Sequence, residues 1–355
     1  MNVNFDLLVS GCNTRCAHCY VNGGPGRNMP TELALECIEK LDSIAALLPE
    51  GASFTLDNEP FNHPDIASII RAAASVKSVS HYHHGMTTGV ALMGRKDREE
   101  AVAEYLSLGF TEFGITLHGA AAHHDEIVGR RGAFGTALCA AEFLKACGAE
   151  VGVSLLLNRF FEEDAEELER TVTALSPEYV YFGVPNYTPH ANMWRFDGYR
   201  ASIKELYAFA PVLERLGVNA EKALEKAGRS TVGAAVRMFE NGLEVRELFE
   251  KEQDELYLSV RQDGRLYIGN TGAETRCMGE LVSLEPESAA ETIRSLPGNR
   301  DYGAFYDMER LPETAELVTA LKRLPADSLY DDISSVVCRG LAELGVRTKI
   351  LAISD

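Results

Sequence analysis

The motif Cys12-Asn-Thr-Arg-Cys16-Ala-His-Cys19-Tyr20 lies close to the start of the chain and is its most informative feature. Its three cysteines have the spacing Cys-x3-Cys-x2-Cys and follow an apolar run, residues 5–9, that predicts a strand. A 4Fe–4S cluster normally takes four thiolates. A loop that offers three leaves one iron of such a cluster open to another ligand. Cys12, Cys16 and Cys19 are therefore predicted metal ligands.

A zinc site and a disulfide framework are the alternatives for these cysteines. Structural zinc prefers four protein ligands and often pairs one Cys-x2-Cys with a second, but the sequence has no second such pair. Disulfide frameworks are typical of small secreted proteins, whereas this chain has 355 residues, 8 cysteines and no apolar leader at its start. The spacing favours the cluster.

With an aromatic residue, Tyr20, directly after the third cysteine, the loop resembles that of the radical S-adenosylmethionine (SAM) superfamily. The resemblance implies an enzyme with one 4Fe–4S cluster whose open iron binds the amino and carboxylate groups of SAM. It also implies that an electron passed through the cluster splits SAM into methionine and a 5′-deoxyadenosyl radical. That radical takes a hydrogen atom from a carbon of the substrate. Tyr20 is assigned to the cofactor site.

Composition narrows the possible partners. The chain carries 34 Lys and Arg against 53 Asp and Glu, a formal net charge of −19, so nucleic-acid binding is not expected. It is 46% hydrophobic, which is ordinary for a globular protein, and no apolar stretch is long enough to span a membrane. A cytoplasmic protein without a membrane partner is predicted.

Strand-like and helix-like segments alternate over the first 216 residues. The expected strands are 3–10, 53–56, 78–84, 113–117, 151–157 and 179–184, and the expected helices are 31–48, 63–76, 98–108, 134–147, 162–175 and 199–216. Six strand–helix units predict an α/β fold, an open partial (β/α)6 barrel with a parallel sheet. Active sites of parallel barrels lie at the C-terminal ends of the strands, and the cysteine loop follows the first strand.

The rest of the chain predicts a helical connector over 217–254 and a small α+β domain over 255–355. A hairpin is expected over 256–269 with Asp263-Gly264 at its turn, followed by helices at 287–295, 312–323 and 333–343 and a last strand at 348–353. This region resembles the SPASM/twitch branch of the superfamily, whose members carry further cysteine ligands there for auxiliary clusters. Only Cys277 and Cys338 are available, so a second cluster is not expected.

Asp57-Asn58-Glu59-Pro60 follows the second strand, where the superfamily has a Gly-Gly-Glu-Pro segment that holds the SAM amino group. The resemblance assigns Asp57, Asn58 and Glu59 to cofactor binding, and a carboxylate beside an ammonium group is chemically sensible. Both glycines of the family segment are replaced here. The alternative is a simple turn before a helix.

Further cofactor contacts are expected at the ends of the later strands. The segment from Gly114 to Phe134 resembles the SPASM/twitch branch, which implies Thr116 and His118 near SAM or the substrate and Arg130 on an anionic group, with Arg131 equally eligible. Ser154, Asn158 and Val184 end the next two strands and are assigned to SAM. Burial within the core is the alternative for Ser154.

Two other groups of residues are open to more than one interpretation. His81-Tyr-His-His84 could hold a metal, but rim or substrate-facing histidines are favoured because no acid or cysteine lies nearby in sequence. Cys277 is either packed or a catalytic thiol that gives a hydrogen atom to a substrate radical, which would lead to epimerisation.

The favoured function is a radical SAM oxidoreductase or isomerase that acts on a small biosynthetic molecule by epimerisation, dehydrogenation or rearrangement. No cobalamin or leader-peptide domain is expected before Cys12, which favours the small substrate. The alternatives are a maturase of a ribosomally made peptide and a non-catalytic iron–sulfur electron carrier or sensor. A flavodoxin- or ferredoxin-type reductant is the implied partner.

Overall fold

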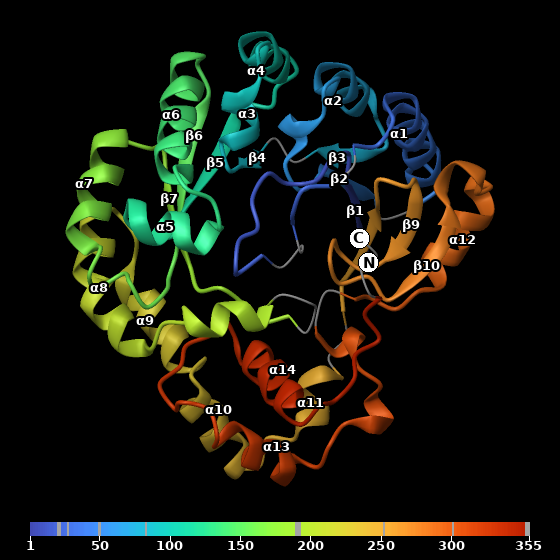
Figure 1. Cartoon of the computed structure of the whole chain (residues 1–355). Coiled ribbons are helices and arrows are strands. Elements are labelled where there is room, and N and C mark those ends of the chain that lie inside the picture. The colour runs from blue at the N-terminus through green and yellow to red at the C-terminus, as the bar shows by residue number, and fades with distance from the viewer. Residues whose placement is uncertain are drawn as a thin grey trace.

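A computed structural model describes residues 1–19, 23–26, 28–48, 51–81, 84–188, 193–250, 253–299 and 302–351. Strands line the inside of a ring, and helices cover its outside (Figure 1). The segment that follows the first strand lies near the centre of this ring. Tyr20 falls outside the described residues, so its assignment stays a prediction.

Two parallel sheets form the partial barrel. β1 (Asn2–Leu7), β2 (Ala52–Leu56) and β3 (Val79–His81) pair in one, and β4 (His84–Thr87), β5 (Glu112–Leu117), β6 (Glu150–Leu156) and β7 (Val180–Gly183) pair in the other. The strand predicted at 78–84 is thus two consecutive strands. β3 bonds to β2, whereas β4 continues to residue 87 and bonds to β5. The predicted open (β/α)6 barrel is confirmed, with its third strand in two pieces.

The six helices expected around the barrel are all present. They are α1 (Thr31–Ala45), α2 (Ile66–Ser75), α4 (Arg98–Ser107), α6 (Ala133–Ala146), α7 (Ala165–Leu175) and α8 (Ile203–Arg215). The predicted start of the last helix at 199 was too early, because Ser202 caps α8 in a capping box with Glu205. Two short helices, α3 (Val90–Gly94) and α5 (Ala121–Val128), follow β4 and β5 and were not predicted.

The predicted hairpin joins the barrel sheet. β8 (Glu255–Val260) pairs in parallel with β1, and β9 (Arg265–Ile268) and β10 (Arg276–Glu280) extend the sheet beyond it in antiparallel pairs. Gly264 at the turn has φ of +77°, and the Arg265 amide donates to the Asp263 carboxylate. The sheet order is β10-β9-β8-β1-β2-β3. The third strand, β10, was not predicted.

The other C-terminal elements are helices. They are α9 (Ala220–Gly228), α10 (Val232–Glu240), α11 (Val245–Phe249), α12 (Pro286–Ser295), α13 (Thr314–Leu321) and α14 (Ile333–Glu343), with short 3-10 turns at Pro60–Asn62, Met193–Gly198, Leu281–Ser283, Tyr302–Phe305 and Met308–Arg310. The predicted strand at 348–353 is wrong for residues 348–351, which are not in a strand. Isolated backbone bonds hold them: the Lys349 amide donates to the Phe305 carbonyl, and the Leu351 amide donates to the Glu274 carbonyl.

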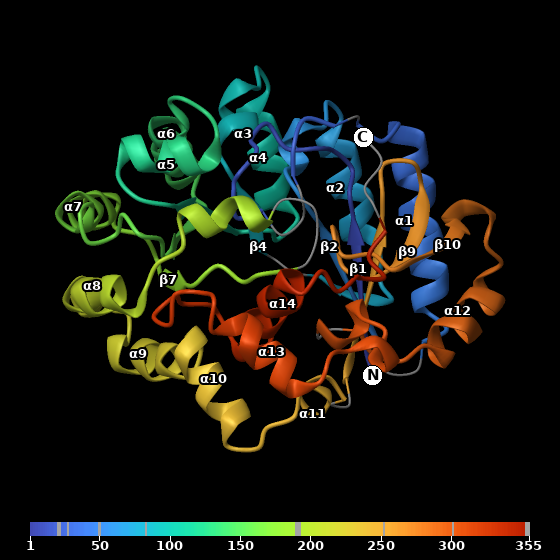
Figure 2. The same cartoon turned by 60° about the horizontal axis from the view of Figure 1, so that its bottom comes forward.

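The two larger hydrophobic cores of the described residues stabilise the chain. The larger lies between the barrel sheets and their helices and includes Leu258 of β8, and the smaller lies among α10, α11, α13 and α14. The Leu329 amide donates to the Ala201 carbonyl, which joins the end of the barrel to the last helices. α13 and α14 therefore lie between the β7 side and the β8 side of the ring (Figure 2). The domain limits at 216 and 254 stay predictions.

Candidate active site

The three predicted metal ligands come together in the loop after β1. Thr14 Oγ1 lies 3.1 Å from Cys12 Sγ and 3.5 Å from Cys16 Sγ, and the Gly23 amide donates to Cys19 Sγ at 3.0 Å. A Cβ atom on Gly23 would lie 3.2 Å from Cys19 Sγ and 3.4 Å from Cys12 Cβ. The backbone of Gly23, which has no side chain, thus fits closely beside Cys12 and Cys19. The loop gathers three sulfur donors without a disulfide.

The end of α5 holds the cysteine loop in place. The Arg15 amide donates to the Val128 carbonyl at 3.2 Å, and the Ala17 amide donates to the Ile127 carbonyl at 2.8 Å. Arg130, which is exposed, donates from its guanidinium to the Asn13 carbonyl at 3.4 Å. Arg130 therefore lies against the cysteine loop, and its predicted role with an anionic group stays a prediction.

Burial disfavours the thiolate form of two of the three cysteines, Cys12 and Cys16. Burial raises the pKa of Cys12, and it raises the pKa of Cys16 to about 11. Metal binding to such groups has to release protons, as it does at thiolate sites in general. Three sulfur donors on one loop fit a cluster that keeps one iron open.

A cavity of about 130 Å³ opens beside Cys16. Five of its lining residues were predicted: Cys16, Asn58, Glu59, Thr116 and His118. The sequence analysis did not assign the others to the site: His18, Met86, Thr87, Thr88, His124, Val128 and Ala133. The cavity thus joins the cysteine loop to the ends of β2, β4 and β5.

Asn58 has a backbone conformation that suits glycine. Its φ is +71°, in the left-handed region, where asparagine is among the few other residues that fit. This explains how a segment that resembles Gly-Gly-Glu-Pro keeps its shape although both glycines are replaced. Asp57, the residue before it, accepts a bond from the Asn58 amide at 2.7 Å.

The Glu59 carboxylate is buried and bound by the next strand end. Thr87 Oγ1 donates to one carboxylate oxygen at 2.7 Å, and the Thr88 amide and hydroxyl donate to the other at 2.7 and 2.8 Å. Burial raises the pKa of this carboxyl group, and the threonine bonds oppose that rise. Glu59 thus ties β2 to β4 in the lining of the cavity, and its predicted contact with SAM stays a prediction.

Two imidazoles, one half-buried and one buried, lie close together beside the cysteine loop. The ring centres of His18 and His118 lie 4.3 Å apart, and the Nδ1 atom of each has no hydrogen-bond partner among the described residues. Burial lowers the pKa of His18 to about 4 and that of His118 well below its usual range, so both rings are neutral. Each ring keeps a polar atom free for a ligand. The sequence feature that could have identified His18 as a site residue is its position between the second and third cysteines.

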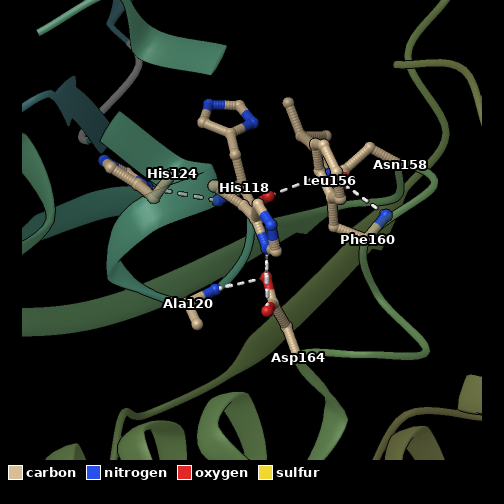
Figure 3. A network of polar contacts seen from close by, with 8 residues as sticks. His118, Ala120, His124, Leu156, Asn158, Phe160 and Asp164 are labelled. Carbon is tan, nitrogen blue, oxygen red and sulfur yellow. Dashed lines mark hydrogen bonds and ion pairs between the residues drawn. The ribbon is translucent and has the colours of Figure 1, made fainter. Parts of the chain in front are cut away.

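A network of polar contacts fixes the backbone of His118 (Figure 3). Its amide donates to His124 Nδ1 at 3.3 Å, and its carbonyl accepts from Asn158 Nδ2 at 2.6 Å. Asn158 is fully buried, donates also to the Leu156 carbonyl, and accepts from the Phe160 amide. The Asp164 carboxylate accepts from the Ala120 amide and pairs with His123. The strand end after β5 is held from both sides.

The other predicted cofactor residues lie on neighbouring strands or just after them. Thr116 of β5 pairs in register with Ser154 of β6, and both are partly exposed. Val184 follows β7 directly. Asp125 has a structural role, because its carboxylate accepts from the Gly132 and Phe134 amides at the start of α6. The side chains of His81 and His84 and the residues between them lie outside what is described.

Cys277 lies apart from the cavity lining. It is exposed on β10, paired with Tyr267 of β9, and three strands away from β1. Cys338 is buried in α14, in the second core. Within the described part of the chain, neither belongs to a group of side chains that could hold a metal. The catalytic role of Cys277 stays a prediction.

The sequence of the barrel half matches a known family. Residues 7–175 match the model of the Radical SAM superfamily. This part of the chain is a radical SAM domain. Radical SAM domains use a 4Fe–4S cluster and S-adenosylmethionine, and these are the cofactors of the chain. A search among curated proteins finds no match.

Solved structures agree with the radical SAM fold. The chain resembles anSMEcpe with bound AdoMet, with a TM-score of 0.54 and 13% identity over 96% of this chain and 95% of the other. It also resembles Streptococcus suis SuiB bound to precursor peptide SuiA, with a TM-score of 0.52 and 12% identity over 94% and 75% of the two chains. A third structure, anSMEcpe with AdoMet and the Kp18Cys peptide, gives 0.51 and 13% over 80% and 79%. At these identities the likeness establishes the fold alone.

Proposed function

We propose that the chain is a radical SAM enzyme that removes a hydrogen atom from a carbon of a small biosynthetic molecule. Bound together, the cluster and SAM would supply a 5′-deoxyadenosyl radical. The observation that carries this proposal is the cavity beside Cys16, which joins the three-cysteine loop to the polar ends of β2, β4 and β5. Epimerisation, dehydrogenation or rearrangement is the proposed outcome.

The chain's own residues have separate tasks in this proposal. Cys12, Cys16 and Cys19 hold the cluster. Asp57, Asn58 and Glu59 form the rim at the end of β2, which is suited to the SAM amino group because its carbonyl and carboxylate oxygens accept from an ammonium. His18 and His118, being neutral, offer Nδ1 atoms to an uncharged polar group without repelling it. Thr116, Ser154, Asn158 and Val184 complete the SAM side, and Tyr20 and Arg130 are assigned to the same cofactor.

A small molecule is the first candidate substrate of this proposal. A peptide is the second candidate substrate, and the observation that favours it is that the solved relatives anSMEcpe and SuiB were determined with bound peptides. We also propose a cytoplasmic location, a flavodoxin- or ferredoxin-type reductant, and a SPASM/twitch-like C-terminal region without its own cluster. No helix in the described residues is apolar and long enough to cross a bilayer.

An anaerobic assay tests the proposal. The chain is reconstituted with iron and sulfide, its iron is counted, and dithionite and SAM are added. We expect about four irons per chain and release of 5′-deoxyadenosine, as one cluster with an open iron requires. Cys16→Ala should lose both, whereas Cys139→Ala, which changes an exposed cysteine on α6, should keep both.

Three other results would change the assignment. About eight irons would indicate an auxiliary cluster. Bound zinc with no cleavage of SAM would point to the closed zinc site instead. A four-iron protein that never cleaves SAM under reduction would support an electron carrier or sensor.

A further inference from the structure

The cysteine loop lies in a part of the chain that has no acidic residues. Asp and Glu make up 53 of the 355 residues, yet none occurs between residues 7 and 31, which include the loop. None occurs between residues 127 and 141 either, a segment that runs from the end of α5 into α6. In a chain with a net charge of −19, a negatively charged partner is repelled least where such segments reach the surface.

The two acid-free segments meet at the cysteine loop. The Arg15 and Ala17 amides donate to carbonyls at the end of α5, and α5 lies beside the central segment of the ring (Figure 1). A Cβ atom on Gly129 would lie 3.3 Å from the Arg15 carbonyl oxygen. The Arg130 guanidinium donates to the Asn13 carbonyl from the same side. The segments therefore form one continuous face.

Three arginines lie on this face, and we call them the arginine patch: Arg15, Arg130 and Arg131. All three are exposed. Among the described residues, no carboxylate pairs with Arg15 or Arg131, and Arg130 bonds only a backbone carbonyl. The positive charge of the patch is thus not compensated by the chain. Arg15 and Arg131 are not assigned to SAM, so their charges are available to a partner.

The two acids at the end of α5 have other partners. The Asp125 carboxylate accepts from the Gly132 and Phe134 amides at the start of α6. Glu126 bonds the Tyr199 hydroxyl. Neither forms an ion pair with an arginine of the patch in the described part of the chain. The patch therefore keeps its charge although two carboxylates lie on the same helix.

A small apolar cluster borders the patch. Ala17 of the cysteine loop, Ile127 of α5 and Phe196 pack together, and the half-buried Phe160 and Tyr199 pack against them. Partly exposed aromatic side chains beside arginines are typical of protein–protein interfaces. Weak electron-transfer complexes bury less than about 1,200 Å² of total surface, so they need only a small contact area.

We propose that the arginine patch is the docking surface for an acidic protein that carries one electron. This inference rests on the proposed function, which requires an external reductant, and it identifies where that reductant binds. Arg15 directly precedes Cys16, so a protein bound at the patch contacts the loop that would hold the cluster. One electron then passes from the carrier, which is oxidised, to the cluster, which is reduced. No covalent bond forms or breaks in this transfer.

Charge favours an acidic carrier over two other partners. A basic peptide would be repelled by the patch. A nucleic acid would be attracted to the patch but would extend beyond it onto a chain with 53 acidic residues. A small acidic protein can turn its most negative face to the arginines, and the acidic remainder of the chain steers it to that orientation.

The first test measures binding rather than activity. Oxidised flavodoxin and a ferredoxin, two acidic carriers, are titrated anaerobically into the reconstituted chain, and calorimetry gives a Kd for each. We expect at least one of them to bind. Its affinity should fall as sodium chloride is raised, because salt screens exposed charges.

Charge-reversing variants locate the surface. Arg15→Glu and Arg131→Glu should each raise the Kd about three- to tenfold, since each replaces an attraction by a repulsion. Arg323→Glu is the matched control and should keep the Kd of the unmodified chain. It changes an exposed arginine directly after α13 that likewise has no ion pair among the described residues. Arg131 lies outside the cysteine loop, so Arg131→Glu remains a test if Arg15→Glu does not hold its iron.

Cleavage of SAM gives a second measurement. At a low concentration of reduced carrier, the rate of 5′-deoxyadenosine release is divided by the rate with dithionite. This ratio should fall in both patch variants by about the factor by which the Kd rises, because dithionite does not need a protein docking surface. The ratio should stay unchanged in Arg323→Glu.

Four results would overturn the inference: no binding of either carrier, binding that salt does not weaken, an unchanged Kd in both patch variants, or an equal rise in Arg323→Glu. Failure of the two proposals can be told apart. A chain that holds about four irons and cleaves SAM with dithionite, but gives one of these results, contradicts the docking surface alone. A chain without the cluster contradicts the proposed function.

Discussion

Asn158 donates a hydrogen bond to the carbonyl oxygen of His118 at 2.6 Å, so a residue at the end of β6 fixes the backbone of a residue at the end of β5. Asn158 is fully buried and lies outside the cavity lining, whereas His118 lines the cavity. His124 holds the same backbone through the His118 amide. The position of the His118 ring thus depends on Asn158 and His124, which bond its backbone from two sides.

Asn158→Ala should weaken SAM binding and destabilise the fold. The change leaves the buried His118 carbonyl without its donor, which costs about 1–3 kcal/mol of unfolding free energy. Urea unfolding gives the stability, and equilibrium binding gives the affinity for SAM. Thr231→Ala is the matched control, because loss of the α10 cap also costs about 1 kcal/mol but lies in the second core's helices. If both variants lost SAM affinity equally, Asn158 would affect SAM binding only through the stability of the fold.

The left-handed conformation of Asn58 gives a second prediction. Asn58→Gly should leave the unfolding free energy within a few tenths of a kcal/mol, whereas Asn58→Ala should cost about 1–2 kcal/mol, because a Cβ carbon without a compensating polar group is unfavourable there. Denaturant titration of the reconstituted enzyme measures both. Ser176, which ends α7 with φ of +48°, is the control position. Its alanine variant should likewise have a lower unfolding free energy than its glycine variant. An Asn58→Ala variant more stable than Asn58→Gly would contradict the assignment.

Much of this fold follows from local patterns. The cysteine spacing and the alternation of strands and helices predict the barrel, because each signal depends on residues adjacent in sequence. The pairing of β8 with β1 was not predictable in the same way, since it joins residues 2–7 to 255–260. The bonds from Thr87 and Thr88 to Glu59 likewise cross about thirty residues and depend on the packing of two strand ends. His18 could have been found from the sequence, because it lies within the cysteine loop itself.

Asp6 predicts how stability changes with pH. Burial, Asp57 and Glu274 all raise its pKa in the folded chain, and Arg261 is engaged with Glu274. A raised pKa means that the stabilising contribution is complete below the ordinary carboxyl pKa and is lost as pH rises through the folded value. Because an asparagine side chain does not ionise, Asp6→Asn removes this loss of stability. The variant should therefore gain in melting temperature over the unmodified enzyme as pH rises above the ordinary carboxyl pKa.

The free cysteines differ in their access to solvent, which bears on the proposed catalytic thiol. Iodoacetamide should label Cys139 and Cys277, which are exposed, and spare Cys37 and Cys338, which are fully buried and whose pKa burial raises. Mass spectrometry of the digested chain measures the modified fractions.

If Cys277 gives a hydrogen atom to the substrate, Cys277→Ala should lose the product while 5′-deoxyadenosine is still released, and Cys139→Ala should keep both. Unchanged product in Cys277→Ala would leave Cys277 as an exposed residue of β10 without a catalytic role.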